Sequence, residues 1–282
     1  AALENAPIGS SMFCLQGSVH LNPVDTQHGQ EALTVLSGRH IVLAGNQSSC
    51  GSRCTISAGR RSPLFKAAPN ASIVFRDLTL VDGNAADPFG EQQGNGGVAY
   101  VRVGSLVRFE RCTLCNNSAT SHGGVVFLED KASASFEACD LTGNYADGTG
   151  GVVAWSQFSR GLQRGTLALV PTADFRNCTL IGNASPRGGV AFVFWNGYLR
   201  FRDCAFASNG GDAMGDGGIV KLAGRAPRLE MLNCSIVDSK AYHGVGTVIS
   251  IEPPEESLGA AHAVLKSTHI RGAAADFAVL LW

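Results

Sequence analysis

The residues of this chain best suited to acid–base chemistry lie in the segments that separate two recurring motifs. His122 and Asp147 occupy successive segments, Asp216 and His243 do the same further along, and Asp212 lies close to Asp216. A histidine held by a carboxylate can move a proton near neutral pH, and two carboxyls about 5 to 10 Å apart can cleave a glycosidic bond. If successive segments stack, His122 would lie beside Asp147 and Asp216 beside His243. These five residues are therefore the candidate catalytic groups of a carbohydrate-active enzyme, either a polysaccharide lyase or a glycosidase.

The rest of the sequence favours a non-enzymatic role. Asp87, Glu91 and Arg187 occupy the same segments, but polar residues are expected in turns. The chain has only five Lys, no dense acidic cluster of the kind that binds Ca²⁺, and no recognisable Ser-His-Asp or phosphate-loop pattern. We therefore expect no cofactor and no metal site.

Most of the nine cysteines recur at one place in a repeat, between residues that we expect to face inward. A column of buried thiols is the interpretation we prefer, since buried Cys packs as a small hydrophobe; disulfides between neighbouring coils are the alternative. A metal site is disfavoured, because cysteines strung along a rod cannot close a tetrahedron. The proposed column consists of Cys112, Cys139, Cys178, Cys204 and Cys234.

The remaining cysteines have more local interpretations. Cys50 and Cys54 lie in what reads as a polar loop and are a candidate disulfide in an oxidising compartment. Cys115 forms a CxxC with Cys112, and we expect it to be a turn residue, either free or paired locally.

The elements that must position these residues belong to a repeat of about 30 residues. A block that reads Phe-x-x-Cys-x-Leu in its clearest copies recurs, with first residues at Phe75, Phe109, Phe136, Phe175, Phe201, Met231 and Leu265. The apolar residues of a block alternate with polar ones around a corner, which indicates strands rather than a helical stripe. A strand-only period of this length predicts an all-β fold, a right-handed single-stranded parallel β-helix, of about nine or ten coils.

We expect one domain over residues 1–282, with irregular early coils in 1–74 and regular repeats in 75–282. The 39-residue interval after Phe136 indicates an insertion around residues 155–165. The chain ends on an apolar strand, so we expect it to be part of a longer protein.

An asparagine follows the first residue of each strong block by eight positions, and a diglycine then opens a second apolar run. Asn tolerates left-handed turns, and its amide can bond to the next coil. The spacing therefore predicts an asparagine ladder at one corner of the coil, made of Asn117, Asn144, Asn183 and Asn209.

Six N-x-[ST] sequons also occur. Asn183 is assigned to the ladder, whereas the other five are glycosylation candidates if the protein is secreted by a eukaryote. Those five are Asn46, Asn70, Asn116, Asn177 and Asn233, of which Asn46 and Asn70 lie in expected loops.

The blocks resemble the repeats of the chlamydial polymorphic outer membrane protein family, which combine a GGA[ILV] element with an FxxN element. Here GG[VI] takes the place of the first, as at Gly123-Gly124-Val125, and Phe206-Ala-Ser-Asn209 matches the second. Similar repeats occur in right-handed β-helix proteins of the wider pectin-lyase-like group. The resemblance implies this fold and a place on a cell surface.

The net charge of −1 removes the usual electrostatic case for binding nucleic acid, and no apolar run is long enough for a membrane helix. We expect an extracellular or cell-surface module that acts as a rigid scaffold or adhesion surface. Its partners would be other surface proteins, stacking copies or neighbouring β-helix modules, or glycans. Trp155, Phe158 and Trp195 are candidate exposed contacts.

Overall fold

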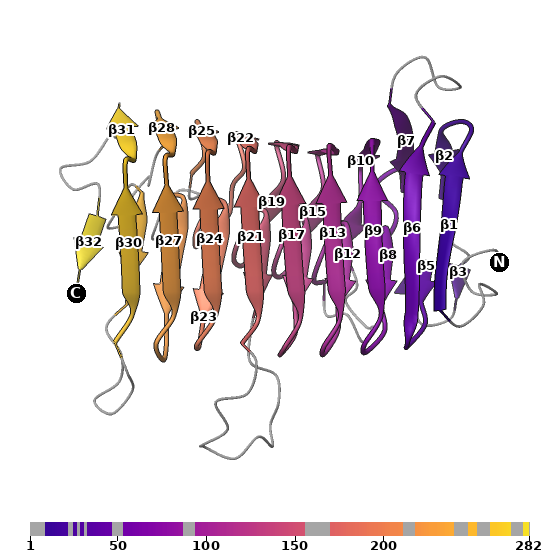
Figure 1. Ribbon diagram of the computed structural model, residues 1–282, viewed down its shortest axis with the longest axis horizontal. Helices are drawn as coiled ribbons and strands as arrows, with labels where there is room; N and C mark the ends of the chain where they lie inside the picture. Colours follow the sequence, from indigo (N-terminus) through magenta and orange to yellow (C-terminus); the bar gives the residue numbers. More distant parts are fainter. Residues whose placement is uncertain are drawn as a thin grey trace.

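The computed structural model describes residues 9–21, 25–26, 29–30, 33–46, 53–86, 94–155, 170–210, 218–239, 248–252, 260–271 and 279–281. All regular structure in these ranges is β-strand, and the strands of each large sheet pair in parallel, one coil upon the next (Figure 1). The chain is therefore a parallel β-solenoid, which confirms the predicted all-β right-handed β-helix.

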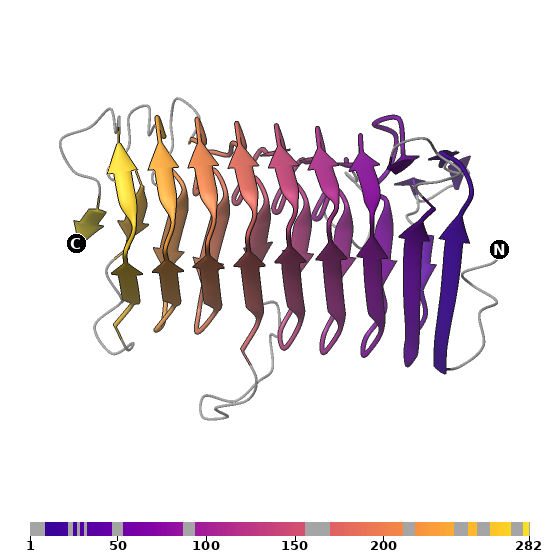
Figure 2. The same ribbon diagram turned by 45° about the horizontal axis from the view of Figure 1, so that its top comes forward.

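Three sheets run along the rod, and each contains nine strands (Figure 2). The first sheet has the longest strands of the regular coils: β1 (Gly9–Leu15), β6 (Arg39–Gly45), β9 (Ser72–Arg76), β13 (Leu106–Glu110), β17 (Ser133–Glu137), β21 (Thr172–Arg176), β24 (Tyr198–Arg202), β27 (Arg228–Leu232) and β30 (His262–Lys266). The second follows after a bend: β2 (Val19–His20), β7 (Cys54–Ser57), β10 (Leu78–Val81), β14 (Thr113–Cys115), β18 (Asp140–Thr142), β22 (Thr179–Ile181), β25 (Ala205–Ala207), β28 (Ser235–Val237) and β31 (His269–Arg271).

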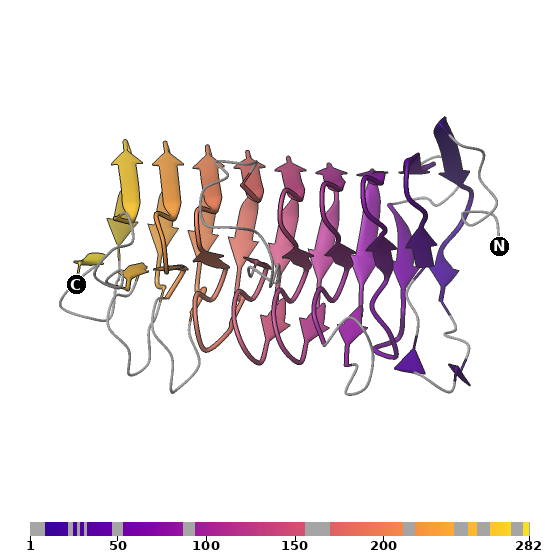
Figure 3. The same ribbon diagram turned by 90° about the horizontal axis from the view of Figure 1, so that it is seen from below.

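The third sheet closes each coil (Figure 3). It contains β5 (Leu33–Val35), β8 (Phe65–Ala67), β12 (Ala99–Val101), β16 (Val126–Leu128), β20 (Val153–Trp155), β23 (Ala191–Phe194), β26 (Val220–Ala223), β29 (Ile249–Ile251) and β32 (Val279–Leu281). Two-residue strands β11 (Asn84–Ala85), β15 (Ser118–Ala119) and β19 (Tyr145–Ala146) form a small additional sheet, and β3 (Asp25–Thr26) pairs antiparallel with β4 (Gly29–Gln30).

The regular solenoid has about seven turns, fewer than the nine or ten coils we expected. These turns are the ones that carry the Phe block, from β9 onward. Earlier strands such as β1 and β6 join the same sheets without that block. The expected number came from dividing the whole length by the mean period, so it also counted the irregular early coils.

The first residue of the block forms a stack through the core. In the strand register, Phe109 lies between Phe75 and Phe136, and Phe175 follows Phe136. Neighbouring rings in this file are 4.3 to 5.1 Å apart between centroids and lie within 27° of parallel. Because this spacing matches the separation of paired strands, about 4.8 Å, each coil places its ring directly over the last.

A left-handed residue makes the bend between the first and second sheets in every regular coil. It lies two residues after the Phe position and has a φ of 50 to 54° at Asp77, Arg111, Ala138, Asn177, Asp203, Asn233 and Ser267. Asn and Asp adopt this conformation with little strain. Arg111 and Ala138 do so because the strands on both sides of the bend fix the backbone.

The diglycines make the corner before the third sheet. The first glycine of the pair has a positive φ, as at Gly123 with 66°. The second has no room for a side chain: a Cβ on Gly124 would overlap the carbonyl oxygens of Gly151 and Tyr145. Both glycines are thus required by the backbone path.

Trp155, expected as an exposed contact, is instead fully buried in β20 and is 1% exposed. It follows Val153 by two residues in the strand, so its side chain points inward with that of Val153. Trp195 is half-buried, at a left-handed position with a φ of 49°. Phe158 and most of the expected insertion lie outside the described residues.

Candidate functional site

The five repeated cysteines directly follow the left-handed residue of each bend and point into the core, where none is more than 2% exposed. They are Cys112, Cys139, Cys178, Cys204 and Cys234, all free thiols, and we call them the thiol column. The strand register places each of them over its counterpart in the next coil. The alternative of disulfides between coils is therefore not observed.

Each thiol of the column donates to a carbonyl group beside the bend. The Cys139 thiol donates to the carbonyl oxygen of Phe109 in the preceding coil, at 3.5 Å, and to that of Glu137, at 3.3 Å. Cys112, Cys178 and Cys204 make the equivalent pair of bonds. The Glu137 carbonyl also accepts from the backbone N–H of Arg111, so the thiol adds a second hydrogen bond to it.

Leu78 occupies the same position in the coil of β9 and β10 without a donor, whereas Thr268 supplies one. Thr268 holds the equivalent place in the coil of β30 and β31, and its hydroxyl donates to the carbonyl oxygens of Met231, at 3.3 Å, and Lys266, at 3.2 Å. A hydroxyl can therefore make the bonds of the thiol. The sequence pattern alone did not reveal this role.

Interaction between neighbouring thiols acts in opposite directions along the column: it raises the pKa of Cys112, Cys178 and Cys234 and lowers that of Cys139 and Cys204, while burial opposes ionisation of all five. The thiol of Cys139, together with desolvation, raises the pKa of Cys112, and the same causes raise that of Cys178. Because every thiol of the column is buried and lies within hydrogen-bond distance of a carbonyl oxygen, which can only accept, the geometry is that of protonated donors.

Cys54 differs from the prediction of a polar loop. It is the first residue of β7, is fully buried, and pairs in register with Leu78. Leu78 in turn precedes Thr79, which pairs with Thr113, so Cys54 lies in line with Cys112 two coils away. Cys50 lies outside the described residues, and a disulfide between Cys50 and Cys54 stays a prediction.

Cys115, the second residue of the CxxC, is a free thiol at the end of β14 and half-buried. Desolvation raises the pKa of this thiol. Within the described ranges, no three His, Cys, Asp or Glu side chains form a group that could hold a metal ion.

The asparagines form a continuous ladder of hydrogen bonds. The Oδ1 atom of Asn144 accepts from the backbone N–H and the Nδ2 of Asn117, at 3.1 and 3.0 Å, while its own Nδ2 donates to the carbonyl of Leu114, at 3.0 Å. Asn183 and Asn209 repeat this arrangement, and all four side chains are fully buried. The amides of Asn117, Asn144 and Asn183 thus each tie three coils together at one corner, and that of Asn209 ties two.

The sequon asparagines outside the ladder lie mostly on exposed turns. Asn70, Asn116, Asn177 and Asn233 are exposed and have a φ of 50 to 59°. Asn46 is half-buried, and its Nδ2 donates to Gln16. The left-handed conformation alone accounts for Asn at four of these positions.

Of the candidate catalytic residues, the structure places His122 beside Thr149 rather than beside Asp147. A β-bridge pairs His122 with Thr149 and Thr149 with Arg187, and the Thr149 hydroxyl lies 2.9 Å from the Nδ1 of His122. Asp147 is exposed, and its N–H donates to Ala119 in another part of the turn. His122 and Thr149 each directly precede the diglycine of their coil, at Gly123 and Gly150, whereas Asp147 lies two residues earlier in a turn of the same length.

His122 is an uncharged ring in a largely buried setting. Desolvation, and to a lesser extent the charge of Arg187, lowers its pKa. Its ring also stacks on Phe127, with centroids 6.1 Å apart. Asp212, Asp216 and His243, as well as Asp87 and Glu91, lie outside the described residues, so their proposed pairing is not tested.

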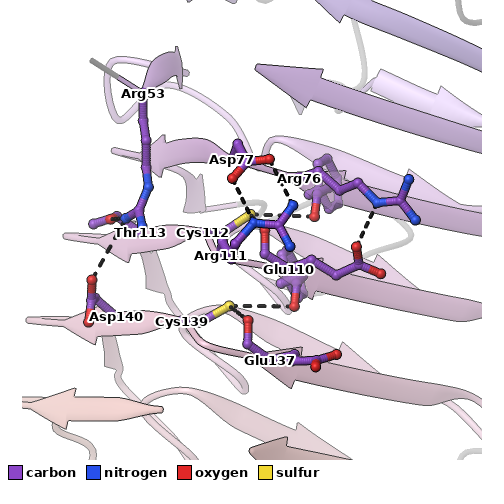
Figure 4. A network of polar contacts seen from close by, with 12 residues as sticks. Arg53, Arg76, Asp77, Glu110, Arg111, Cys112, Thr113, Glu137, Cys139 and Asp140 are labelled. Carbon is purple, nitrogen blue, oxygen red and sulfur yellow. Dashed lines mark hydrogen bonds and ion pairs between the residues drawn. The ribbon is translucent and has the colours of Figure 1, made fainter. Parts of the chain in front are cut away.

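The outer face beside the bends carries ion pairs that link one coil to the next (Figure 4). Arg111 makes two bonds of 2.9 Å to the carboxylate of Asp77, and Arg76 lies 2.6 Å from Glu110. Arg111 lowers the pKa of the Asp77 carboxyl. Further along, Arg200 of β24 binds Asp174 of β21. These pairs could not be predicted from the sequence, because only the strand register brings their members together.

No protein-family model, curated protein or solved structure matches the chain. None of the described segments forms a helix long and apolar enough to span a bilayer.

Proposed function

We propose that this chain is a non-enzymatic module that provides a rigid scaffold, or an adhesion surface, outside the cell. The observation that carries the proposal is the uninterrupted set of ladders. The Phe stack, the thiol column and the asparagine ladder pass through the same consecutive coils in one register. Such a core resists bending and leaves the outward residues free to vary.

The polar groups most suited to chemistry are engaged in holding coils together. His122 bonds to Thr149, and Arg111 and Arg76 bond to carboxylates of neighbouring coils. This use of the functional groups supports a structural role over that of a lyase or glycosidase.

The extracellular part of the proposal is supported by the exposed sequons. Asn70, Asn116, Asn177 and Asn233 point their side chains away from the core on turns that could carry a glycan without disturbing a strand. Partners of the module would be other surface proteins, neighbouring β-helix modules or glycans that contact one face of the rod. It would bind no nucleic acid and insert no segment into a membrane. The likeness to polymorphic outer membrane protein repeats fits this setting.

Expression with a secretion signal in a eukaryotic cell tests the location. We expect the mass of the secreted protein to fall when a peptide amidase removes its N-glycans. Before this treatment, Asn177→Gln and Asn233→Gln should each have a lower mass than the wild type. Asn183→Gln, at the buried sequon, should instead lower stability without removing a glycan. A secreted chain that carries no glycan at the exposed sequons would contradict the glycoprotein proposal.

Incubation with a panel of acidic and neutral polysaccharides tests the absence of catalysis. Unsaturated products are followed by ultraviolet absorbance and new reducing ends by a colorimetric assay. We expect neither for the wild type. Turnover that His122→Ala abolishes would overturn the non-enzymatic proposal.

A further inference from the structure

The thiol column places five sulfur atoms in one straight file inside the rod. Its members come from consecutive coils and belong to one apolar cluster. We propose that adjacent thiols of this column bind soft d¹⁰ cations such as Hg(II), Ag(I) or Cu(I), one cation between two sulfurs in a straight line. This site goes beyond the scaffold role and does not depend on it.

The spacing of the coils fits linear coordination. Paired strands are separated by about 4.8 Å, and in-register cysteines with equivalent thiol hydrogen bonds repeat at that distance. A metal–thiolate bond is about 2.3 Å long, as for zinc, so two such bonds in a line span nearly the same length. The cation would therefore enter midway between Cys139 and Cys178, for example, with little movement of either coil.

The same geometry disfavours the other reactions of paired thiols. Zn²⁺ needs about four ligands around one point, whereas the column offers only two sulfurs at any level, and no larger group of metal-ligating side chains exists among the described residues. A disulfide needs Cβ atoms about 3.8 Å apart, which is closer than in-register strands allow. Linear coordination is the one mode that the file supports without distortion.

Binding exchanges protons for the metal. Two thiols lose one proton each to solvent, two sulfur–metal bonds form, and the S–H bonds to carbonyls such as Phe109 O are lost. With Hg(II) the product carries no net charge, which suits the apolar surroundings. Thiolate sulfur is the ligand that soft cations prefer. Because the thiols are at most 2% exposed, uptake should be slow and should need opening of a coil.

The test uses the full chain in a background that lacks the other cysteines, Cys14→Ser, Cys50→Ser, Cys54→Ser and Cys115→Ser. The reduced protein is titrated with HgCl₂ at pH 7, stoichiometry is read by native mass spectrometry, and coordination by X-ray absorption. Five thiols in a row hold at most two adjacent pairs, so we expect two Hg(II) per folded chain. Each metal should have two sulfur neighbours in a line.

Two double variants, each with three remaining thiols, test whether binding depends on the thiols being neighbours or only on their number. Cys112→Ser with Cys139→Ser leaves three neighbouring thiols, and Cys139→Ser with Cys204→Ser leaves three that are all separated by a serine. Serine keeps a donor to the bend carbonyls, as Thr268 does. We expect the first variant to bind one Hg(II) and the second to bind at least 100-fold more weakly.

Equal binding by the two double variants would overturn the proposal. So would the absence of binding in the background protein, coordination by three or more sulfurs, or loss of the far-ultraviolet strand signal as the metal binds. If either double variant does not fold, the stoichiometry and sulfur count of the folded background protein decide the question.

Discussion

Ser239 stands where the next rung of the asparagine ladder would be. It follows Met231 by eight residues, as Asn209 follows Phe201. Its side chain is buried, and its hydroxyl has no hydrogen-bond partner among the residues that the structure describes. The ladder therefore ends at Asn209, and Ser239 occupies the next position without extending it.

Ser239→Asn should extend the ladder and stabilise the protein. The new Oδ1 would accept from Asn209 and the new Nδ2 would donate to the carbonyl of Phe206, by analogy with Asn209 and Leu180. We expect the free energy of unfolding, measured with urea, to rise by about 1 kcal/mol.

Gly83→Asn is the matched control at the other end of the ladder. Gly83 already donates its N–H to the Oδ1 of Asn117, at 3.0 Å, but a Cβ there would overlap the carbonyl of Gly97. This substitution should lower stability although it also completes the sequence pattern. A loss of stability in Ser239→Asn would contradict the proposed geometry.

His122 predicts a dependence of stability on pH. The pKa of this ring is lowered in the folded state, whereas the unfolded value is about 6.5. Below that pH the unfolded chain binds more protons than the folded one, so the contribution of the neutral ring is complete above about pH 6.5 and is lost as the pH falls through the folded pKa.

Urea titrations at pH 7.5 and pH 5 measure this effect. Stability should fall more between these two conditions for the wild type than for His122→Asn. Thr149→Ser keeps the hydroxyl beside Nδ1 and should behave as the wild type. An identical pH dependence in His122→Asn would show that the ring does not titrate as described.

At the scale of elements, the repeat predicted strand positions better than turn positions. Phe136, Cys139 and Leu141 are spaced so that two strands meet at a corner, and the structure has this arrangement. The left-handed residue at the corner was not predictable, because Arg111 and Ala138 occupy it as readily as Asn177. Its conformation is set by the register of the strands and not by its own side chain.

The strand β7 shows the limit of recognising a repeat by its first residue. Cys54-Thr55-Ile56 has the same pattern as Cys112-Thr113-Leu114, but no Phe precedes it at the expected distance. The prediction of a polar loop therefore missed a strand, although the second half of the repeat pattern is present in its sequence. The pairing of His122 with Thr149 was missed for a different reason: the two turns were compared by residue type, whereas counting back from the diglycine of each coil places Thr149 opposite His122.

The diglycine corner makes the sharpest prediction for a single element. In Gly124→Ala the new Cβ would overlap two backbone carbonyls, and neither can move without breaking a pairing between coils. We expect a loss of about 3 kcal/mol in the free energy of unfolding, of the size found for overpacked cores.

Gly182→Ala is the control for that corner. Gly182 has a φ of 62° but open space around its Cβ position. Only the left-handed strain of about 1 kcal/mol should appear there. Equal losses for the two variants in chemical denaturation would show that close packing is not what Gly124 provides.

At the scale of the whole molecule, strand pairing joins every described coil only to the coils beside it, and Arg53, which reaches Thr113 and Asp140, is a side chain that spans further. Strand β17 is paired on both sides, whereas β1 and β30 are paired on one. The Phe, thiol and asparagine ladders add the same neighbouring contacts at each level. Stability is therefore expected to be distributed along the rod and lowest at its ends.

Hydrogen exchange followed by mass spectrometry measures this distribution. Amides of β13, β17 and β21 should exchange most slowly and those of β1 and β30 most rapidly. Protection that is uniform along the chain would mean that the rod opens as one unit, contrary to the contacts between neighbours.

The overall architecture could be predicted, because the stacking of coils requires similar residues at equivalent positions. The location of the protein and its partners could not be predicted in this way. The Phe blocks alone were sufficient to identify a parallel solenoid. Nothing in a repeated interior specifies what meets the outer surface, since Phe136 and Cys139 would be equally suited to any such rod. That information lies in outward residues such as those of the ion pairs, whose contacts depend on the register.

The register stays constant although the length of chain between successive Phe positions varies from 26 to 39 residues. A gene for such a protein can gain or lose codons between strands without displacing a single interior side chain. It can also duplicate a whole repeat and obtain a longer rod with the same cross-section. The interior residues and the loops between strands are thus inherited under separate constraints. Natural variation should accumulate in the loops of each coil, while the interior residues change slowly.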